Sequence, residues 1–385
     1  MLRMTDIAAR AGVSQTTVSF VLNGRESSVR ISESTRNRVL AAAEELGYRS
    51  NHLARAMRTG STNMLGFIGG DLCSEHVGRM LDGALEEAEK HGFTLKILPH
   101  REAENGMEQI VRRASELRLA GVAALHLPLE MLEMLRAETQ QFGNAMVLLD
   151  TPEPLDGVAQ VMSDDQNGVF LLVEHLVELG HRRIAMISSS HISTHAVVRE
   201  RAFHLAMRSF DLEVPENYIA CGDFRQLEPS QEAARFLLGL PLDERPTAIF
   251  CIGDLVACAA LQIAAKMGID VPRAVSIVGF GDLQVSRLSV PTVTTIHQPF
   301  REMGARAVQR LVEQATGQSD ARNDARSQAR RVKARADDSS SESENRRRAP
   351  KIDADLATFQ AESSHCEVEQ MPIRLDKRDS TAPPP

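Results

Sequence analysis

The sequence predicts a multi-domain protein: an all-α head with a helix-turn-helix, followed by an α/β core of two parallel-sheet subdomains. Two patterns predict this division. Residues 1–48 show three short helical patterns separated by glycines and capping residues, whereas residues 62–297 alternate short apolar runs with amphipathic segments. Such alternation is typical of open parallel sheets, and about nine strands fit two sheets better than one.

The charge distribution divides the chain at the same place. Residues 1–60 hold nine Arg and five Asp or Glu, a net charge of +4, and the other residues hold 35 basic and 47 acidic side chains, a net charge of −12. A cationic head on an anionic body indicates a polyanionic partner for the head alone.

Capping and turn residues delimit the three helices of the head. In chain order the expected signals are Thr5 or Asp6, Gly12, Ser14, Asn23-Gly24, Ser32 and Gly47. Between the first two helices, Ala8 allows close approach, Gly12 supplies a left-handed turn and Val18 packs between them. This spacing predicts a helix-turn-helix.

The core is expected to contain strands at 64–68, 94–98, 122–127, 145–149, 184–187, 218–221, 248–252, 276–280 and 293–296. Helices lie between them, such as 77–91 with its apolar stripe, and a last alternating segment at 368–375 indicates one further strand. Residues 319–365 carry ten Lys or Arg, nine Asp or Glu and eight Ser with few large apolar side chains. That composition predicts a disordered insertion.

These patterns give the domain organisation. We expect a helix-turn-helix head at 1–48, a core at 61–318 plus 366–385, and the insertion at 319–365; residues 49–60, which connect the head to the core, are assigned as a hinge only by the family resemblance described below. The five cysteines show neither CxxC nor zinc-ligand spacing. No apolar run reaches the ~18 residues of a membrane helix, and no secretory leader is evident. We therefore expect a cytoplasmic protein with no membrane association, no cofactor and no metal site.

Three stretches carry a family resemblance: TDIAARAGVSQTTVSFVLNG, ISESTRNRVLAAAEELGY and NHLARAMRTGST. They resemble the lactose-repressor (LacI/GalR) family of bacterial transcription regulators, and the resemblance covers nearly all of the chain outside 319–365. It implies a homodimer on a near-palindromic DNA operator, with one recognition helix in each half-site and an effector that shifts the two core subdomains.

The second helix is the expected recognition helix, because its N-terminal end is polar. Gln15, Thr16 and Ser19 share one face and are the candidate base contacts; Gln pairs with adenine, and a Thr methyl group contacts that of thymine. Phe20 stands where most of the family carries Arg or His, so either it packs inward or the operator is read differently there. Candidate phosphate contacts are Thr5, Ser14, Asn23 and Arg25.

Residues 50–58 resemble the family's hinge helix, which folds when two subunits meet in the minor groove. The resemblance makes Met57 the side chain that wedges into the central base step, a role the family gives to Leu. Ala54 faces the same groove, and Arg55 and Arg58 bring positive charge. Ser50 replaces the usual proline.

Four predicted strands end in a Gly-Asp dipeptide, and their aspartates are Asp71, Asp223, Asp254 and Asp282. Because ligands of open α/β sheets bind at the carboxyl ends of strands, converging carboxylates there suit a sugar or another polyol. The alternative is that each Asp only caps the following helix.

The resemblance implies further effector contacts. Asp164 matches the acid of the family's D-N-x-x-G motif, Arg199 matches an effector-binding arginine, and Phe224 stands where an aromatic ring meets the ligand. Asp254 and Asp282 match the acids of the N-D and F-D-D motifs, although Gly253 and Gly281 replace their neighbours. The first loop is also unusual, and Asp71, Glu75 and His76 are its candidate contacts.

The leading interpretation is a DNA-binding regulator, specifically a repressor of carbohydrate-metabolism genes controlled by a small polar effector such as a sugar. A sugar-active enzyme is the first alternative, but the sequence shows no GxSxG, P-loop or HExxH motif, and we expect no catalytic residue. The second alternative is an effector-independent DNA-binding protein whose pocket is vestigial.

Overall fold

The computed structural model describes residues 3–22, 31–47, 62–100, 106–189, 193–315 and 367–385. The chain divides into two compact units, Met1–Asn63 and Met64–Pro385, which we call the head and the core. Several expectations lie outside the described residues: the hinge at 49–60, the insertion at 319–365, and the side chains of Asn23, Arg25, Ala54, Arg55, Met57 and Arg58.

The head contains three helices: α1 (Met4–Ala11), α2 (Gln15–Leu22) and α3 (Glu33–Glu45). Gly12 ends α1 in the left-handed conformation with φ of 63°, and Ser32 caps α3 by accepting the backbone N–H of Thr35. Ile7, Val18 and Val39 are fully buried where the three helices meet. The predicted helix-turn-helix is confirmed.

The start of α1 differs from the prediction. Thr5 lies inside the helix, and Arg3 is its N-terminal flanking residue. The Asp6 carboxylate accepts the backbone N–H of Arg3 at 2.8 Å. Asp6 therefore accepts a free N–H at the start of the helix although Asp6 itself lies within the first turn. An aspartate in this role cannot be distinguished from an N-cap aspartate by residue type alone.

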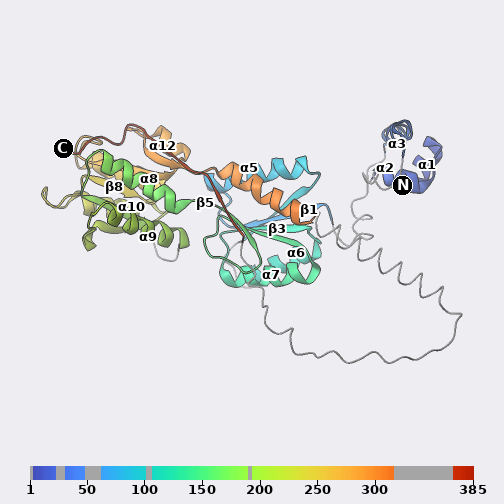
Figure 1. Cartoon of the computed structure of the whole chain (residues 1–385), viewed down its shortest axis with the longest axis horizontal. Helices are drawn as coiled ribbons and strands as arrows, with labels where there is room; N and C mark the ends of the chain where they lie inside the picture. Colours follow the sequence, from blue (N-terminus) through green and yellow to red (C-terminus); the bar gives the residue numbers. More distant parts are fainter. Residues whose placement is uncertain (1–2, 23–30, 48–61, 101–105, 190–192, 316–366) are drawn as a thin grey trace, which may run out of the picture. The chain divides into compact units, whose positions relative to one another are not determined.

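The core consists of two lobes, each built on a six-stranded sheet (Figure 1). We define the N-lobe as residues 64–163, the helix 300–315 and the strand β11, and the C-lobe as residues 165–297, the strand β12 and the segment to 385. The predicted two-sheet core is confirmed.

The N-lobe sheet has the order β11-β5-β4-β3-β1-β2, and every pairing is parallel. Its elements are β1 (Met64–Gly69), α5 (Glu75–Lys90), β2 (Thr94–Pro99), α6 (Gly106–Glu116), β3 (Gly121–Leu125), α7 (Leu129–Phe142), β4 (Ala145–Leu149), β5 (Ala159–Ser163), the helix 300–315 and β11 (Val368–Met371). Alternate residues face opposite sides: Phe67 packs toward α5 and the helix 300–315, and Ile68 packs toward α6 and α7.

The C-lobe sheet has the order β12-β10-β9-β8-β6-β7, in which only the edge strand β12 runs antiparallel. Its elements are α8 (Asp165–Glu178), β6 (Ile184–Ser189), α9 (Thr194–Ser209), the 3-10 turn η2 (Glu216–Tyr218), β7 (Ile219–Gly222), α10 (Leu227–Leu238), β8 (Ala248–Cys251), α11 (Asp254–Lys266), β9 (Ser276–Gly281), α12 (Gln284–Leu288), β10 (Thr294–His297) and β12 (Arg374–Asp376).

Two differences from the predicted strands change the topology. The strand β5 is not among the nine predicted, and the single strand expected at 368–375 is two strands. β11 pairs with β5 in the N-lobe, and β12 pairs with β10 in the C-lobe. The chain therefore passes between the lobes three times, after β5, after β10 and after β11.

Two glycines bring α5 against the helix 300–315. A Cβ on Gly83 would lie 1.9 Å from the carbonyl oxygen of Arg301, and one on Gly304 would lie 1.8 Å from that of Met80. Only glycine allows backbones to approach this closely. In the described part of the chain no helix is both long enough and apolar enough to cross a membrane.

Candidate functional site

The first candidate surface is the N-terminal end of α2. Ser14 caps this helix, because its hydroxyl accepts the backbone N–H of Thr17 at 3.1 Å. Gln15 and Thr16 follow and are exposed, and Ser19 lies half-buried one turn later. The Ser14 cap fixes the backbone at the start of α2, and Gln15 and Thr16 therefore extend into solvent there. A recognition helix directs this end into the major groove.

Phe20 is half-buried in α2. Thr5 is exposed on α1.

The second candidate site is the junction between the lobes, where Arg199 of α9 is a central side chain. It is 5% exposed. Its guanidinium donates to Asp165 Oδ2 at 2.7 Å and to the carbonyl oxygen of Ile252 at 2.8 Å, and it lies 3.9 Å from the ring centroid of Phe280. These contacts hold Arg199 rigidly within the protein.

The sequence motif points to Asp164, but the buried acid at this place in the fold is its neighbour Asp165. Asp164 is half-exposed and caps α8 by accepting the backbone N–H of Asn167. Asp165 is buried, and its carboxylate accepts hydrogen bonds from Ser163, Arg199 and Gln298. Burial opposes ionisation, but Arg199 and His195 lower the pKa of Asp165. A motif gives the position of an acidic pair but not which member faces inward.

Asp254 and Asp282, two of the predicted effector contacts, each have partners within the core. The Asp254 carboxylate accepts the hydroxyl of Thr295 and the backbone N–H of Leu283, and burial raises its pKa to about 6. Asp282 is fully buried and pairs with Arg287, Arg378 and His297. Burial opposes ionisation there too, but these partners hold the pKa of Asp282 well below its usual range.

Asp71 and Glu75 join the lobes directly. Asp71 Oδ2 lies 3.4 Å from Nε of Arg225 in the C-lobe, and the Glu75 carboxylate accepts the backbone N–H of Gln284. Phe224 is half-buried, and its ring carbons lie 3.4 Å from where a Cβ on Gly253 would stand. The ring therefore lies beside the glycine that replaces the family's Asn.

His76 belongs to a group of imidazoles at the junction. Its ring centroid lies 5.8 Å from that of His126, which lies 5.3 Å from that of His195. His126 Nε2 and Asp150 Oδ2 are 3.3 Å apart. These four residues come from two loops and two helices that are distant in sequence, so they show no local ligand spacing.

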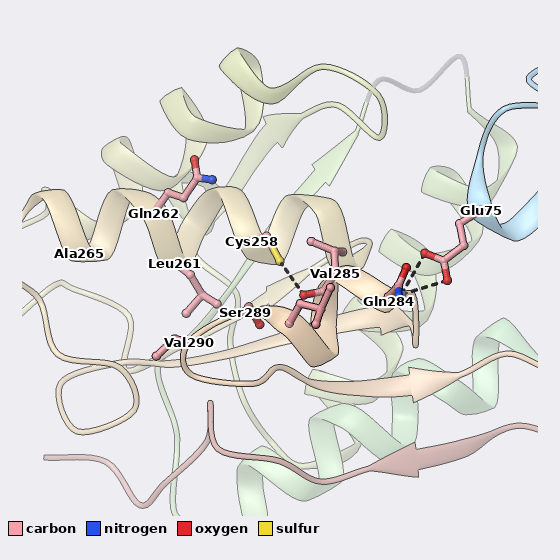
Figure 2. A pocket seen from close by; sticks show the side chains of 10 residues that line it. Glu75, Cys258, Leu261, Gln262, Ala265, Gln284, Val285, Ser289 and Val290 are labelled. Carbon is pink, nitrogen blue, oxygen red and sulfur yellow. Dashed lines mark hydrogen bonds between the residues drawn. The ribbon is translucent and has the colours of Figure 1, made fainter.

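A further surface feature lies on the C-lobe between α11 and α12 (Figure 2). It is a hollow of about 530 Å³, lined by Glu75, Cys258, Leu261, Gln262, Ala265, Gln284, Val285, Leu288, Ser289 and Val290. Leu288 is 73% exposed and Val290 is 93% exposed. Two of its lining side chains are therefore apolar and largely in contact with solvent.

Comparison with known proteins agrees with this architecture. Residues 3–51 match the model of the bacterial regulatory proteins of the lacI family, and residues 173–336 match a periplasmic binding protein-like domain. A relative in Escherichia coli O139:H28 (strain E24377A / ETEC), the HTH-type transcriptional repressor PurR, is 32% identical over 319 residues, which cover 82% of this chain and 90% of the relative.

Two solved structures share the fold. The lac repressor dimer bound to operator and the anti-inducer ONPF is 22% identical, with a TM-score of 0.72 and coverage of 99% of both chains. The transcriptional regulator CelR in complex with cellobiose is 23% identical, with a TM-score of 0.63 and coverage of 99% of this chain and 100% of its own. All three of these proteins are regulators of transcription and not enzymes. The chain belongs to the lacI family, and it is a DNA-binding transcriptional repressor of the LacI/PurR type.

Proposed function

We propose that the repressor acts as a homodimer on a near-palindromic operator, in which α2 of each copy reads one half-site. The observation that carries this proposal is the capped, exposed N-terminal end of α2, with Gln15 and Thr16 in solvent. The net charge of +4 on residues 1–60 supplies the attraction to phosphate that such reading requires.

Selection of genomic DNA fragments with the purified full-length protein tests this proposal. The expected product is a near-palindromic site. Two variants then separate the roles of the head residues. Gln15→Ala is expected to cost about 1–3 kcal/mol at one base pair of each half-site and to relax the preference there. Thr5→Val, which removes a phosphate contact, is expected to weaken all sites equally. Equal weakening of all sites by Gln15→Ala would contradict base reading by α2.

We further propose that a small polar effector, with a sugar as the expected class, binds between the two lobes and changes their relative position. Three chain crossings allow the lobes to move, and polar pairs such as Asp71 with Arg225 join them across the junction. The CelR–cellobiose complex, which shares the fold, supports a carbohydrate as the class. An effector shifts operator affinity only if it binds one lobe arrangement better than the other.

Titration of the selected operator in the presence of a panel of sugars and nucleobases tests effector control. A several-fold change in operator affinity with one compound supports the proposal and gives the class of effector. An operator whose affinity is the same with every compound would favour the alternative of an effector-independent repressor.

The hollow between α11 and α12 is the surface that we propose pairs with a second copy of the chain. Leu288 and Val290 project there as exposed apolar side chains, and Leu255 of α11 is 50% exposed. A near-palindromic operator presents two half-sites, and the lac repressor that shares this fold is described as a dimer. A two-fold interface is self-complementary, so one such surface is sufficient for pairing.

A further inference from the structure

Four side chains with metal-binding atoms meet where the lobes touch. His126 directly follows β3 and Asp150 directly follows β4, so both lie at the carboxyl edge of the N-lobe sheet. His195 is the second residue of α9 in the C-lobe, and His76 is the second residue of α5. The ligand atoms of His126, Asp150 and His195 all lie within 4.8 Å of one another.

The geometry points to a binding site for one divalent transition-metal ion of the zinc class, held by His126, Asp150 and His195, with the ring of His76 beside that of His126. Two imidazoles and one carboxylate form a donor set typical of Zn²⁺ and its neighbours in the first transition row. Oxygen-seeking ions such as Ca²⁺ take six or more oxygen ligands, which this set does not provide.

The separations are close to those around a bound ion. Zn–N and Zn–O bonds of about 2.0–2.2 Å place tetrahedral ligand atoms about 3.3–3.5 Å apart. Asp150 Oδ2 lies 3.3 Å from His126 Nε2 and 3.8 Å from His195 Nε2. A side-chain movement of about 1 Å would bring His195 Nε2 within bonding distance of an ion held by His126 and Asp150. This movement breaks the hydrogen bond that His195 Nε2 makes with the carbonyl oxygen of Asp150.

Asp150 supplies the independent observation. Its side chain is 5% exposed, and its Oδ1 atom is buried with no hydrogen-bond partner within the described residues. A buried carboxylate oxygen without a partner is costly, and a cation bound through both oxygens of the Asp150 carboxylate would remove that cost.

The surroundings of His195 match those of a metal-bound histidine. Such a residue almost always donates the N–H of its other ring nitrogen to a carboxylate or carbonyl group. His195 Nδ1 lies 3.5 Å from Asp165 Oδ2, and Arg199 holds that same oxygen at 2.7 Å.

Because His126 and Asp150 belong to the N-lobe and His195 to the C-lobe, a bound ion ties the lobes together. The lobe arrangement seen here would therefore be favoured by the metal. The consequence for DNA depends on the proposed function, in which lobe position controls operator affinity, whereas metal binding itself does not depend on it.

Titration of chelator-treated full-length protein with Zn²⁺ by calorimetry, and with Co²⁺ by visible absorption, tests the site. The expected result is one ion per chain and Co²⁺ bands of four-coordinate nitrogen and oxygen ligation. His126→Gln and His195→Gln are each expected to weaken binding by at least tenfold. His91→Gln is the matched control, because His91 is exposed on the far end of α5 and should bind metal as the unaltered protein does.

Two outcomes would overturn the inference: an unaltered protein that binds neither ion, or His126→Gln and His195→Gln variants that bind both ions as tightly as His91→Gln. Melting curves without metal show whether each variant is folded, and His126→Gln is the safer variant because its side chain is 26% exposed. Operator titration with and without Zn²⁺ keeps the two proposals apart. Selection of a near-palindromic operator without metal binding rejects only the metal site, and metal binding without any operator rejects only the proposed function.

Discussion

The Glu75 carboxylate accepts the backbone N–H of Gln284 with both oxygens, at 3.0 and 2.9 Å, and so joins α5 of the N-lobe to the first residue of α12 in the C-lobe. Figure 2 shows the side chain reaching across from its own helix. The same carboxylate pairs with Arg79, which donates to the carbonyl oxygen of Asp282 in the C-lobe. One acidic residue of α5 thus organises a polar link between the lobes.

Loss of this link should loosen the lobes. We expect Glu75→Gln to destabilise the core by about 1 kcal/mol, because the charged acceptor is 34% exposed and partly screened. The corresponding fall in melting temperature is about 2 °C. Glu89→Gln on the same helix is the matched control, since Glu89 is exposed. Equal melting temperatures for the two variants would show that the link adds nothing to stability.

The close crossing of α5 and the helix 300–315 predicts that alanine substitutions at two glycines of α5 have very different effects on stability. Gly83→Ala places a Cβ 1.9 Å from a backbone oxygen, so the helices must separate, and we expect a loss of about 3 kcal/mol or more. Gly78→Ala on the same helix meets nothing within 4 Å and should stabilise the protein by up to about 1 kcal/mol through helix propensity. Urea denaturation of both variants measures the difference, and a Gly83→Ala variant as stable as Gly78→Ala would contradict the crossing.

The apolar hollow predicts the oligomeric state of surface variants. Leu288→Glu and Val290→Glu place a charge at the surface proposed to pair with a second copy, and they should give monomers with at least tenfold weaker operator binding. Leu242→Glu is the control, because Leu242 is 77% exposed in the loop after α10. Sedimentation velocity distinguishes the species. Leu288→Glu and Val290→Glu variants that both sediment as Leu242→Glu does would place the interface elsewhere.

Asp254 predicts a pH dependence of stability. Its pKa rises from 3.8 to about 6 on folding, so the folded state binds more protons than the unfolded state between these values. Stability attributable to Asp254 therefore falls as the pH rises from about 4 to about 6, by on the order of 2–3 kcal/mol. The difference in unfolding free energy between the unaltered protein and Asp254→Asn should decline across this range.

Asp254→Asn is a suitable reference because the asparagine oxygen can still accept the N–H of Leu283, and the hydroxyl of Thr295 can accept from the new amide. The histidines titrate in both proteins and cancel in the difference. A difference that does not vary between pH 4 and pH 6 would mean that Asp254 titrates alike in the folded and unfolded states.

Local patterns were sufficient for much of the fold. The helix-turn-helix was predictable from Gly12 and Val18, because a left-handed turn followed at this spacing by a buried apolar residue is typical of two packed helices. Alternation of strands and helices likewise predicted the two parallel sheets. By contrast, β5 (AQVMS) mixes polar and apolar residues, because Gln160 is buried through hydrogen bonds to the backbone and not through hydrophobicity. Periodicity does not detect that kind of burial.

The junction shows where pattern reasoning fails. A Gly-Asp dipeptide marks the carboxyl end of a strand but does not say what the carboxylate meets. Asp254 and Asp282 find partners on neighbouring elements, and Asp282 pairs with Arg378, 96 residues further along the chain. Similarly, His126 and His195 are close only because two lobes meet. Contacts made by tertiary structure between distant segments leave no local spacing to recognise.

The return of the chain through β11 explains why a long stretch of sequence can stand between residues 315 and 367. Arg310 of the helix 300–315 pairs with Glu367 and Glu369, and Arg306 also pairs with Glu369, so both sides of that stretch are fastened to the N-lobe. Each doubling of a connecting segment costs only about 0.6 kcal/mol of closure entropy. Evolution can therefore lengthen, shorten or replace this connection with little effect on the lobes, and an engineer can place a reporter domain there for the same reason.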